Sequence, residues 1–154
     1  MKKLIFLFGI ISGWTQAQMP NISKVWTNNH LPYIGGMSNQ HVLKVQVETS
    51  EQNKKNDQEY FISGTTIKDN METKFEGNMV VKKYKDFKKR GKLFGEYEIA
   101  EENTGKNTGL YKGKFIFSFD WDPKTKQISN QKIEYKGHWK PYQTEKELKT
   151  FWSN

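Results

Sequence analysis

The residues from Tyr111 to Trp121 alternate in polarity with a period of two. One side of this row is aromatic apart from a single glycine, and the other side is mainly polar. The aromatic side consists of Tyr111, Gly113, Phe115, Phe117, Phe119 and Trp121. Successive side chains of a β-strand point to opposite faces of a sheet, which no helix reproduces. The pattern therefore predicts a strand with one face in a core and the other in water.

A turn and a second amphipathic strand follow directly. Asp122-Pro123 predicts the turn, because proline presets φ for a type I turn and an aspartate side chain can accept hydrogen bonds from the N–H groups ahead of it. The apolar side of the returning strand consists of Ile133, Tyr135, Gly137 and Trp139. Ile128 is out of phase with that row, and one extra residue would restore the phase. We therefore expect a hairpin with a β-bulge near Asn130.

Residues 1–17 have the composition of a signal peptide. Two lysines precede an apolar run from Leu4 to Ile11, and the small residues Thr15 and Ala17 mark a cleavage site before Gln18. The apolar run is too short for a permanent membrane anchor. We expect an exported protein, periplasmic or secreted, with one domain over residues 18–154 and no transmembrane segment in the mature chain.

The chain has no cysteine. This excludes disulfides, thiolate metal sites, a cysteine nucleophile and a lipid-modified cysteine at the cleavage site. A small exported chain without disulfides, rich in lysine and asparagine, is more typical of a bacterial envelope than of eukaryotic secretion.

The remaining segments predict an all-β domain. Residues 18–40 predict an irregular arm, and its apolar anchors are Trp26, Leu31, Tyr33 and Ile34. Further strands are expected over residues 41–49, 60–67, 73–84 and 93–100, and polar loops over residues 51–59, 82–92 and 101–108. Helical crossovers between strands are missing, so we expect an antiparallel meander of about seven or eight strands. It would form a small barrel or a strongly curled sheet.

The C-terminal residues change period. Thr144 and Glu147 fit a capping box, and Leu148, Phe151 and Trp152 have the i, i+3, i+4 spacing of one helical face. This predicts a short C-terminal helix docked on the sheet.

Three of the predicted strands carry a glycine between bulky residues on their apolar side. These glycines are Gly77, Gly113 and Gly137. They would let a strand coil sharply or let an aromatic ring lie across the backbone. Alternatively, they would open space for a ligand inside a barrel.

These features resemble a lipocalin-like (calycin) barrel, with an exported meander of fitting size, Trp26 near the mature start, an aromatic interior and a helix after the strands. The Gly-x-Trp motif that lipocalins usually carry is missing, since Ser23-Lys24-Val25-Trp26 has no glycine two residues before the tryptophan. The resemblance implies binding of a small apolar molecule in the barrel mouth.

The aromatic face is the first candidate site. If it encloses a cavity, the lining residues are Tyr97, Tyr111, Phe115, Phe117, Phe119, Tyr135 and Trp139. Burial of an apolar ligand would contribute a binding free energy of about 25 cal/mol per Å² of apolar surface removed from water, and tyrosine hydroxyls would orient its polar end. The same rings can instead fill the interior and leave a packed structural domain.

The second candidate site is basic. Seven basic residues lie in the predicted loop 82–92, opposed only by Asp86; they are Lys82, Lys83, Lys85, Lys88, Lys89, Arg90 and Lys92. Such a cluster attracts anionic surfaces such as lipid headgroups or acidic polysaccharide, while export argues against nucleic acid. The alternative function is therefore an envelope interaction protein with a packed core that acts through this loop. A third interpretation is a solvated hairpin whose lysines prevent edge-to-edge association.

Catalytic and metal signals are weak. The three histidines lack metal-site spacing, and Ser118, Asp120 and His138 form the only Ser/Asp/His grouping on one predicted face. Glu96, Glu98, Glu134 and Asp120 could form a carboxylate pair, but cross-strand ion pairs with lysines explain them more simply. We expect a non-catalytic protein without metal or cofactor.

Overall fold

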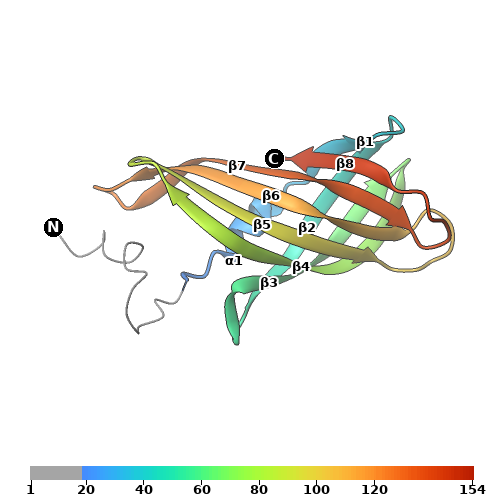
Figure 1. Ribbon diagram of the computed structural model, residues 1–154, viewed down its shortest axis with the longest axis horizontal. Helices are drawn as coiled ribbons and strands as arrows, with labels where there is room; N and C mark the ends of the chain where they lie inside the picture. Colours follow the sequence, from blue (N-terminus) through green and yellow to red (C-terminus); the bar gives the residue numbers. More distant parts are fainter. Residues whose placement is uncertain (1–18) are drawn as a thin grey trace.

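A computed structural model describes residues 19–154, which form a closed barrel of eight antiparallel strands (Figure 1). Each strand pairs with its neighbours in sequence, and β1 pairs with β8 to complete the ring. The strands are β1 (Tyr33–Met37), β2 (Val42–Asn53), β3 (Asn56–Lys68), β4 (Met71–Asp86), β5 (Arg90–Glu101), β6 (Gly109–Asp122), β7 (Gln127–Pro141) and β8 (Leu148–Ser153). The predicted all-β meander and its closure are confirmed. The predicted signal peptide, residues 1–17, lies outside the described residues.

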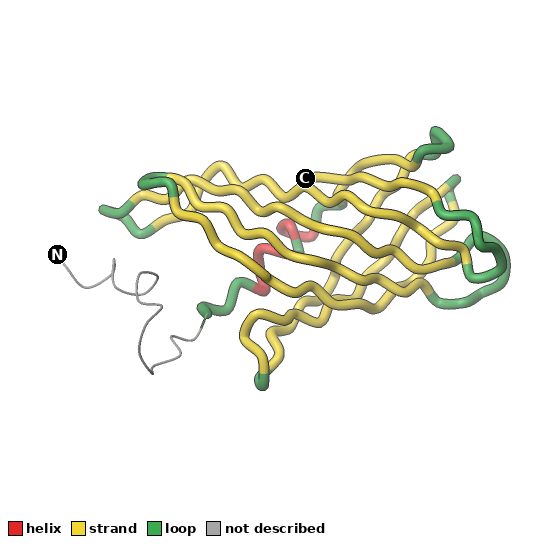
Figure 2. Tube along the Cα trace, viewed as in Figure 1, coloured by secondary structure: helices red, strands yellow, loops and turns green. Residues whose placement is uncertain are grey.

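The predicted arm is more ordered than an irregular segment. It contains α1 (Ser23–Trp26), a single 3₁₀ turn over Asn28–His30, and then β1. Figure 2 shows the helical turns between the near and far strands of the barrel, and the side chain of Trp26 in α1 is fully buried in the core. The prediction of an irregular arm over residues 18–40 is therefore wrong for β1, whose backbone pairs with both β2 and β8. Two predicted anchors, Trp26 and Tyr33, are fully buried, whereas Leu31 and Ile34 are exposed.

The predicted C-terminal helix is wrong. Residues 148–153 form β8, with Trp152 directed into the barrel and Phe151 exposed outside. Trp152 lies opposite Tyr135 on one side and Gly35 on the other. As a strand, β8 satisfies the backbone groups along the free edges of β7 and β1 at once, which a helix cannot do. The hydrogen bonds gained along two strand edges outweigh the local preference for a helix that the i, i+3, i+4 spacing indicates.

The central hairpin is confirmed, including its bulge. Ser118 lies opposite Lys132 and Asp120 opposite Ser129, so two residues of β7 face a single residue of β6. Asn130 in this bulge has φ 50°. In the turn, Oδ1 of Asp122 accepts a hydrogen bond from the N–H of Lys124 at 2.8 Å.

The three predicted loops shrink because strands extend into them. Strands β2 and β3 meet in a tight turn, so residues 51–59 are mostly strand. In the segment 82–92, only residues 87–89 lie between β4 and β5. The loop predicted over residues 101–108 begins one residue later, because Glu101 ends β5. Outward polar side chains dominate these strand ends, so that they resemble loops in composition.

The paired glycines Gly113 and Gly137 explain how closely β6 and β7 approach. They lie directly opposite each other. A Cβ on Gly113 would lie 2.6 Å from the Cα of Gly137 and 2.2 Å from the carbonyl oxygen of Lys136. A Cβ on Gly137 would lie 2.7 Å from the hydroxyl of Tyr97. These glycines thus let backbones and an aromatic side chain meet, which supports the structural interpretation.

Candidate functional site

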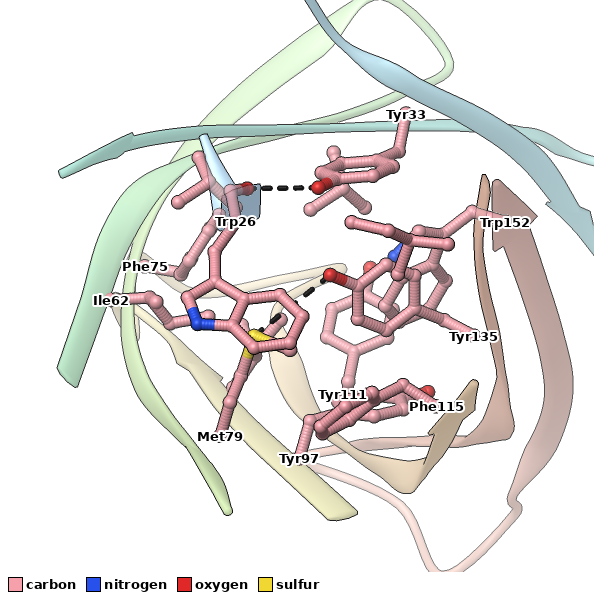
Figure 3. Close-up of a cluster of buried hydrophobic side chains, with 14 of the residues drawn as sticks. Trp26, Tyr33, Ile62, Phe75, Met79, Tyr97, Tyr111, Phe115, Tyr135 and Trp152 are labelled. Atoms are coloured by element: carbon pink, nitrogen blue, oxygen red, sulfur yellow. Dashed lines mark hydrogen bonds between the residues drawn. The ribbon is translucent and has the colours of Figure 1, made fainter. Parts of the chain in front are cut away.

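The predicted cavity-lining side chains all belong to or pack against the hydrophobic core cluster inside the barrel, and Figure 3 labels Tyr97, Tyr111, Phe115 and Tyr135 among them. Six of the seven are buried, and Phe119 is partly buried. The ring centroids of Tyr97 and Tyr135 are 5.5 Å apart, and Tyr135 stacks on Trp152 at 5.3 Å. Trp26 from α1 adds edge contacts with Phe115 and Phe117 at 5.2 and 5.9 Å. Aromatic rings thus occupy the interior face on which the sequence had suggested a ligand.

The tyrosine hydroxyls of this core are held in apolar surroundings. Burial raises the pKa of Tyr33, Tyr97, Tyr111 and Tyr135 above that of an exposed tyrosine. The Tyr33 hydroxyl donates to the carbonyl oxygen of Trp26 at 2.9 Å, and the Tyr135 hydroxyl contacts the sulfur of Met79 at 3.8 Å. These hydroxyls are therefore neutral at physiological pH. Those of Tyr33 and Tyr135 already contact other core residues.

Two open hollows lie over the outer face of the barrel. The first, of about 580 Å³, lies over β2 to β5 and includes Glu51, Glu76 and Glu98 in its wall. The second, of about 380 Å³, lies over β4 to β6 and includes Lys112 and Lys114. Both are open to solvent, and the wall of the second also includes Tyr97 of the aromatic core.

A buried ion pair between Lys68 and Glu101 lies near the ends of β3 and β5, and sequence reasoning missed it. The Nζ atom of Lys68 is 2.7 and 2.8 Å from the two carboxylate oxygens of Glu101, and both side chains are at most 3% exposed. Nζ also lies 4.3 Å from the ring centroid of Trp139. Glu101 continues the odd-numbered inward row of β5, and this phase was the signal that could have revealed it.

Further donors complete the surroundings of Glu101. The backbone N–H of Gly109 donates at 2.8 Å, the indole of Trp139 at 3.2 Å and the hydroxyl of Tyr111 at 3.3 Å. Thr66 donates to the same carboxylate. Burial lowers the pKa of Lys68, while the charge of Glu101 opposes that shift. Because its polar groups are paired and inaccessible, this cluster ties strands together instead of presenting a site.

The β4–β5 and β6–β7 hairpins extend together beyond the rest of the barrel (Figure 1). The pairing of β3 with β4 reaches only to Val80, and that of β8 with β7 only to Glu134. Past these residues the four strands pair with each other, and the N–H of Trp121 donates to the carbonyl of Lys89 at 2.8 Å. We call residues 81–94 together with 116–133 the basic flap.

The seven basic residues of the second candidate site all belong to the basic flap, and all are exposed. The register places Lys85 opposite Lys92, Lys92 opposite Ser118, and Ser118 opposite Lys132. Three lysines and one serine therefore form a single row across four strands, about 4.8 Å apart from strand to strand. Lys85 lies with its Nζ 5.5 Å from the ring centroid of Phe94.

Glu98, Glu96 and Asp120 pair with a basic residue of a neighbouring strand, as predicted, whereas Glu134 pairs with a lysine of its own strand. Glu98 lies 3.0 Å from Lys112, Glu96 lies 3.8 Å from Lys82, and Glu134 lies 3.1 Å from Lys132. Asp120 pairs with Arg90 at 3.4 Å. These exposed pairs account for the carboxylates that had suggested acid–base chemistry.

The Ser/Asp/His grouping does not form. His138 lies opposite Lys112, whereas Ser118 lies opposite Lys132. Ser118 is six residues from Lys112 along β6, and at about 3.3 Å per residue this separates Ser118 from His138 by roughly 20 Å. Within residues 19–154, the His, Asp and Glu side chains do not gather in groups of three that could hold a metal ion.

Comparison with protein-family models gives no match, and neither curated proteins nor solved structures match the chain. The eight-stranded antiparallel barrel is the architecture that a lipocalin-like resemblance implies. In the described part of the chain, neither helical segment has the length and apolar character needed to cross a bilayer.

Proposed function

We propose that this protein is a non-catalytic binding protein of lipocalin-like architecture that acts through its basic flap on an anionic surface. The proposal includes export, with cleavage after Ala17. The observation that carries it is the row in which Lys85 faces Lys92 and Lys132 lies beyond Ser118.

Within this row, the directly opposed Lys85 and Lys92 are unfavourable for the isolated fold, whereas Lys132 is separated from them by Ser118 and pairs with Glu134. Like charges directly opposite each other in a sheet destabilise it, by an amount similar to the roughly 0.2–1 kcal/mol that favourable pairs contribute. Elsewhere on the outer face the lysines have acidic neighbours: Lys112 lies beside Glu98, and Lys114, although opposite Lys136, lies opposite Glu96 on its other side. An anionic partner would neutralise the lysine row, and its attraction would extend over about 8–10 Å at ordinary ionic strength.

Retention on immobilised dextran sulfate tests this proposal. We expect Lys85→Gln/Lys92→Gln to elute at clearly lower salt than the unmodified protein. The matched control is Lys54→Gln/Lys55→Gln, which removes the same charge from two exposed lysines in the β2–β3 turn. The control should elute close to the unmodified protein. Equal shifts for both variants would mean that only net charge matters, and would contradict a specific role for the flap.

A second function is binding of a small apolar molecule between the core rings, which would have to separate to admit it. The indole Nε1 of Trp26 favours this function, because this fully buried donor lacks a hydrogen-bond partner among the described residues. A polar group of a ligand would satisfy it. Native mass spectrometry of protein purified from an exported source tests this function. Extra mass that disappears on denaturation would support a ligand, and the intact mass would also show whether the chain begins at Gln18.

A further inference from the structure

We propose that the anionic surface is a phospholipid bilayer, which the basic flap contacts with its lysines while Phe87 at its tip inserts among the lipid headgroups. This inference rests on the proposed function and names its partner. Three features of the flap distinguish a bilayer from a soluble polyanion: an exposed aromatic tip, apolar residues between the lysines, and a neighbouring tryptophan.

Phe87 lies at the turn of the β4–β5 hairpin and is 53% exposed. The turn is held by hydrogen bonds between Phe87 and Arg90, with N–H to carbonyl distances of 2.8 and 3.3 Å. Lys88 and Lys89 complete this turn, and both are exposed. A large apolar side chain at a fixed tip, flanked by cations, costs free energy in water and gains it at a boundary between headgroups and acyl chains.

The outer face of the flap also combines apolar and basic residues. Phe94 lies opposite Ile116 and, on its other side, opposite Lys83. Both apolar residues are partly exposed, and Lys85 and Lys92 occupy the neighbouring row. Apolar side chains inside a basic border are typical of surfaces that lie on anionic membranes. A sulfated or carboxylated polymer would satisfy the lysines but not these apolar groups.

Trp121 lies beside the tip through its backbone bond to Lys89 and is partly exposed. Tryptophan is favoured at membrane interfaces because its ring is apolar and its N–H is polar. The other tryptophans among the described residues, Trp26, Trp139 and Trp152, are at most 4% exposed. Trp121 continues the inward row of β6, on the face opposite to the lysine row, so its fluorescence reports entry of the tip into the bilayer and not contact of the outer face.

The experiment uses protein beginning at Gln18, which includes the whole described barrel, and vesicles of phosphatidylcholine with or without phosphatidylglycerol. Brominated acyl chains in the vesicles quench tryptophan fluorescence only at close range. The variants are Phe87→Ala, Trp121→Phe and, as a matched control, Phe61→Ala. Phe61 is 50% exposed but lies on β3 outside the flap.

We expect anionic vesicles to bind the protein and quench Trp121, with the quenching absent in Trp121→Phe. Phe87→Ala should weaken binding by about fivefold to tenfold, since it removes the side chain that enters the bilayer. Phe61→Ala should bind like the unmodified protein. Lys85→Gln/Lys92→Gln should weaken binding by about fivefold per lysine removed.

Other results would overturn the inference in distinguishable ways. Vesicle binding that is lost in the lysine variant but unchanged in Phe87→Ala would overturn insertion and leave the proposed function in place. Retention on dextran sulfate without vesicle binding would overturn the bilayer as partner. Vesicle binding and dextran sulfate retention that are both unaffected by Lys85→Gln/Lys92→Gln would overturn this inference and the proposed function together.

Discussion

At the scale of single residues, Lys68 and Glu101 place two charges inside a barrel whose interior is otherwise largely apolar. Taking an ion out of water costs several kcal/mol, and a buried pair recovers this only when its remaining hydrogen-bonding groups are also paired. Glu101 meets that condition through Gly109, Tyr111 and Trp139. The pair therefore stabilises one particular arrangement of the strand ends, since each charge depends on the other.

Glu101→Gln should lower the free energy of unfolding by about 3–5 kcal/mol, because it leaves the ammonium of Lys68 buried without a counter-charge. Urea denaturation measures this loss. The double variant Lys68→Met/Glu101→Gln should be less destabilised than the sum of the two single variants. Glu98→Gln is the matched control, since its pair with Lys112 is half exposed and should contribute less than about 1 kcal/mol. Equal losses for Glu101→Gln and Glu98→Gln would contradict this account.

The sequence pattern predicts the position of Glu101, one of the two charged residues, but not that of its partner. The phase of β5 predicts that Glu101 faces inward with Tyr97 and Ile99. Its partner is harder to predict, because Lys68 reaches Glu101 from another strand and precedes two turn residues, Asp69 and Asn70. A sequence gives the phase of each strand, but the meeting of two charges depends on the register between strands.

At the scale of elements, the sequence predicts strands better than it predicts their ends. The hairpin of β6 and β7 follows from alternation alone, including the bulge at Asn130. The ends of β4 and β5 carry outward lysines and few inward apolar side chains, so residues 82–92 were predicted as a loop. Strand β8 could not be predicted locally, because its reason for being a strand is the free edges of β1 and β7.

Gly113→Ala should destabilise the β6–β7 pair by about 3 kcal/mol, at the upper end of the usual cost of added groups in a packed interior. The added Cβ would meet backbone atoms of Lys136 and Gly137, which cannot move without separating the strands. The matched control is Gly36→Ala in β1, whose Cβ would lie 3.3 Å from the ring of Phe151 and from the carbonyl oxygen of His41. Thermal unfolding of both variants is the measurement. A similar loss in the two would show that close backbone approach is not the reason for Gly113.

At the scale of the whole molecule, the barrel could be predicted but its filling could not. An aromatic face on successive antiparallel strands indicates a curled or closed sheet. Whether that sheet holds a ligand depends on every ring that enters it. Trp26 comes from the predicted arm and Trp152 from the predicted helix, and both occupy the core. Because these two side chains help to fill the interior, the basic flap is the better candidate for the binding site.

The buried tyrosines predict that the whole barrel loses stability at alkaline pH. Burial raises the pKa of Tyr33, Tyr97, Tyr111 and Tyr135 in the folded protein, whereas an unfolded tyrosine titrates near its ordinary value of about 10. Above about pH 10 the unfolded chain therefore binds fewer protons than the folded one. The free energy of unfolding then falls by about 1.4 kcal/mol per pH unit for each tyrosine, or about 5.5 kcal/mol per pH unit for the four together.

Lys68 has the opposite effect on the pH dependence of stability. Its pKa is lowered in the folded protein, so at pH values just below the ordinary lysine pKa the folded protein binds fewer protons than the unfolded chain. The one proton of Lys68 cannot outweigh the four tyrosine protons, so the free energy of unfolding should still fall steeply as the pH rises above about 10. Urea denaturation at about pH 9 and about pH 11 measures the slope, and the absorbance of tyrosinate reports ionisation in the folded state. Tyr97→Phe should reduce the slope by about a quarter. If these tyrosines ionise near pH 10 in the folded protein, water reaches their hydroxyls, and the interior is open to a ligand instead of filled by its own rings.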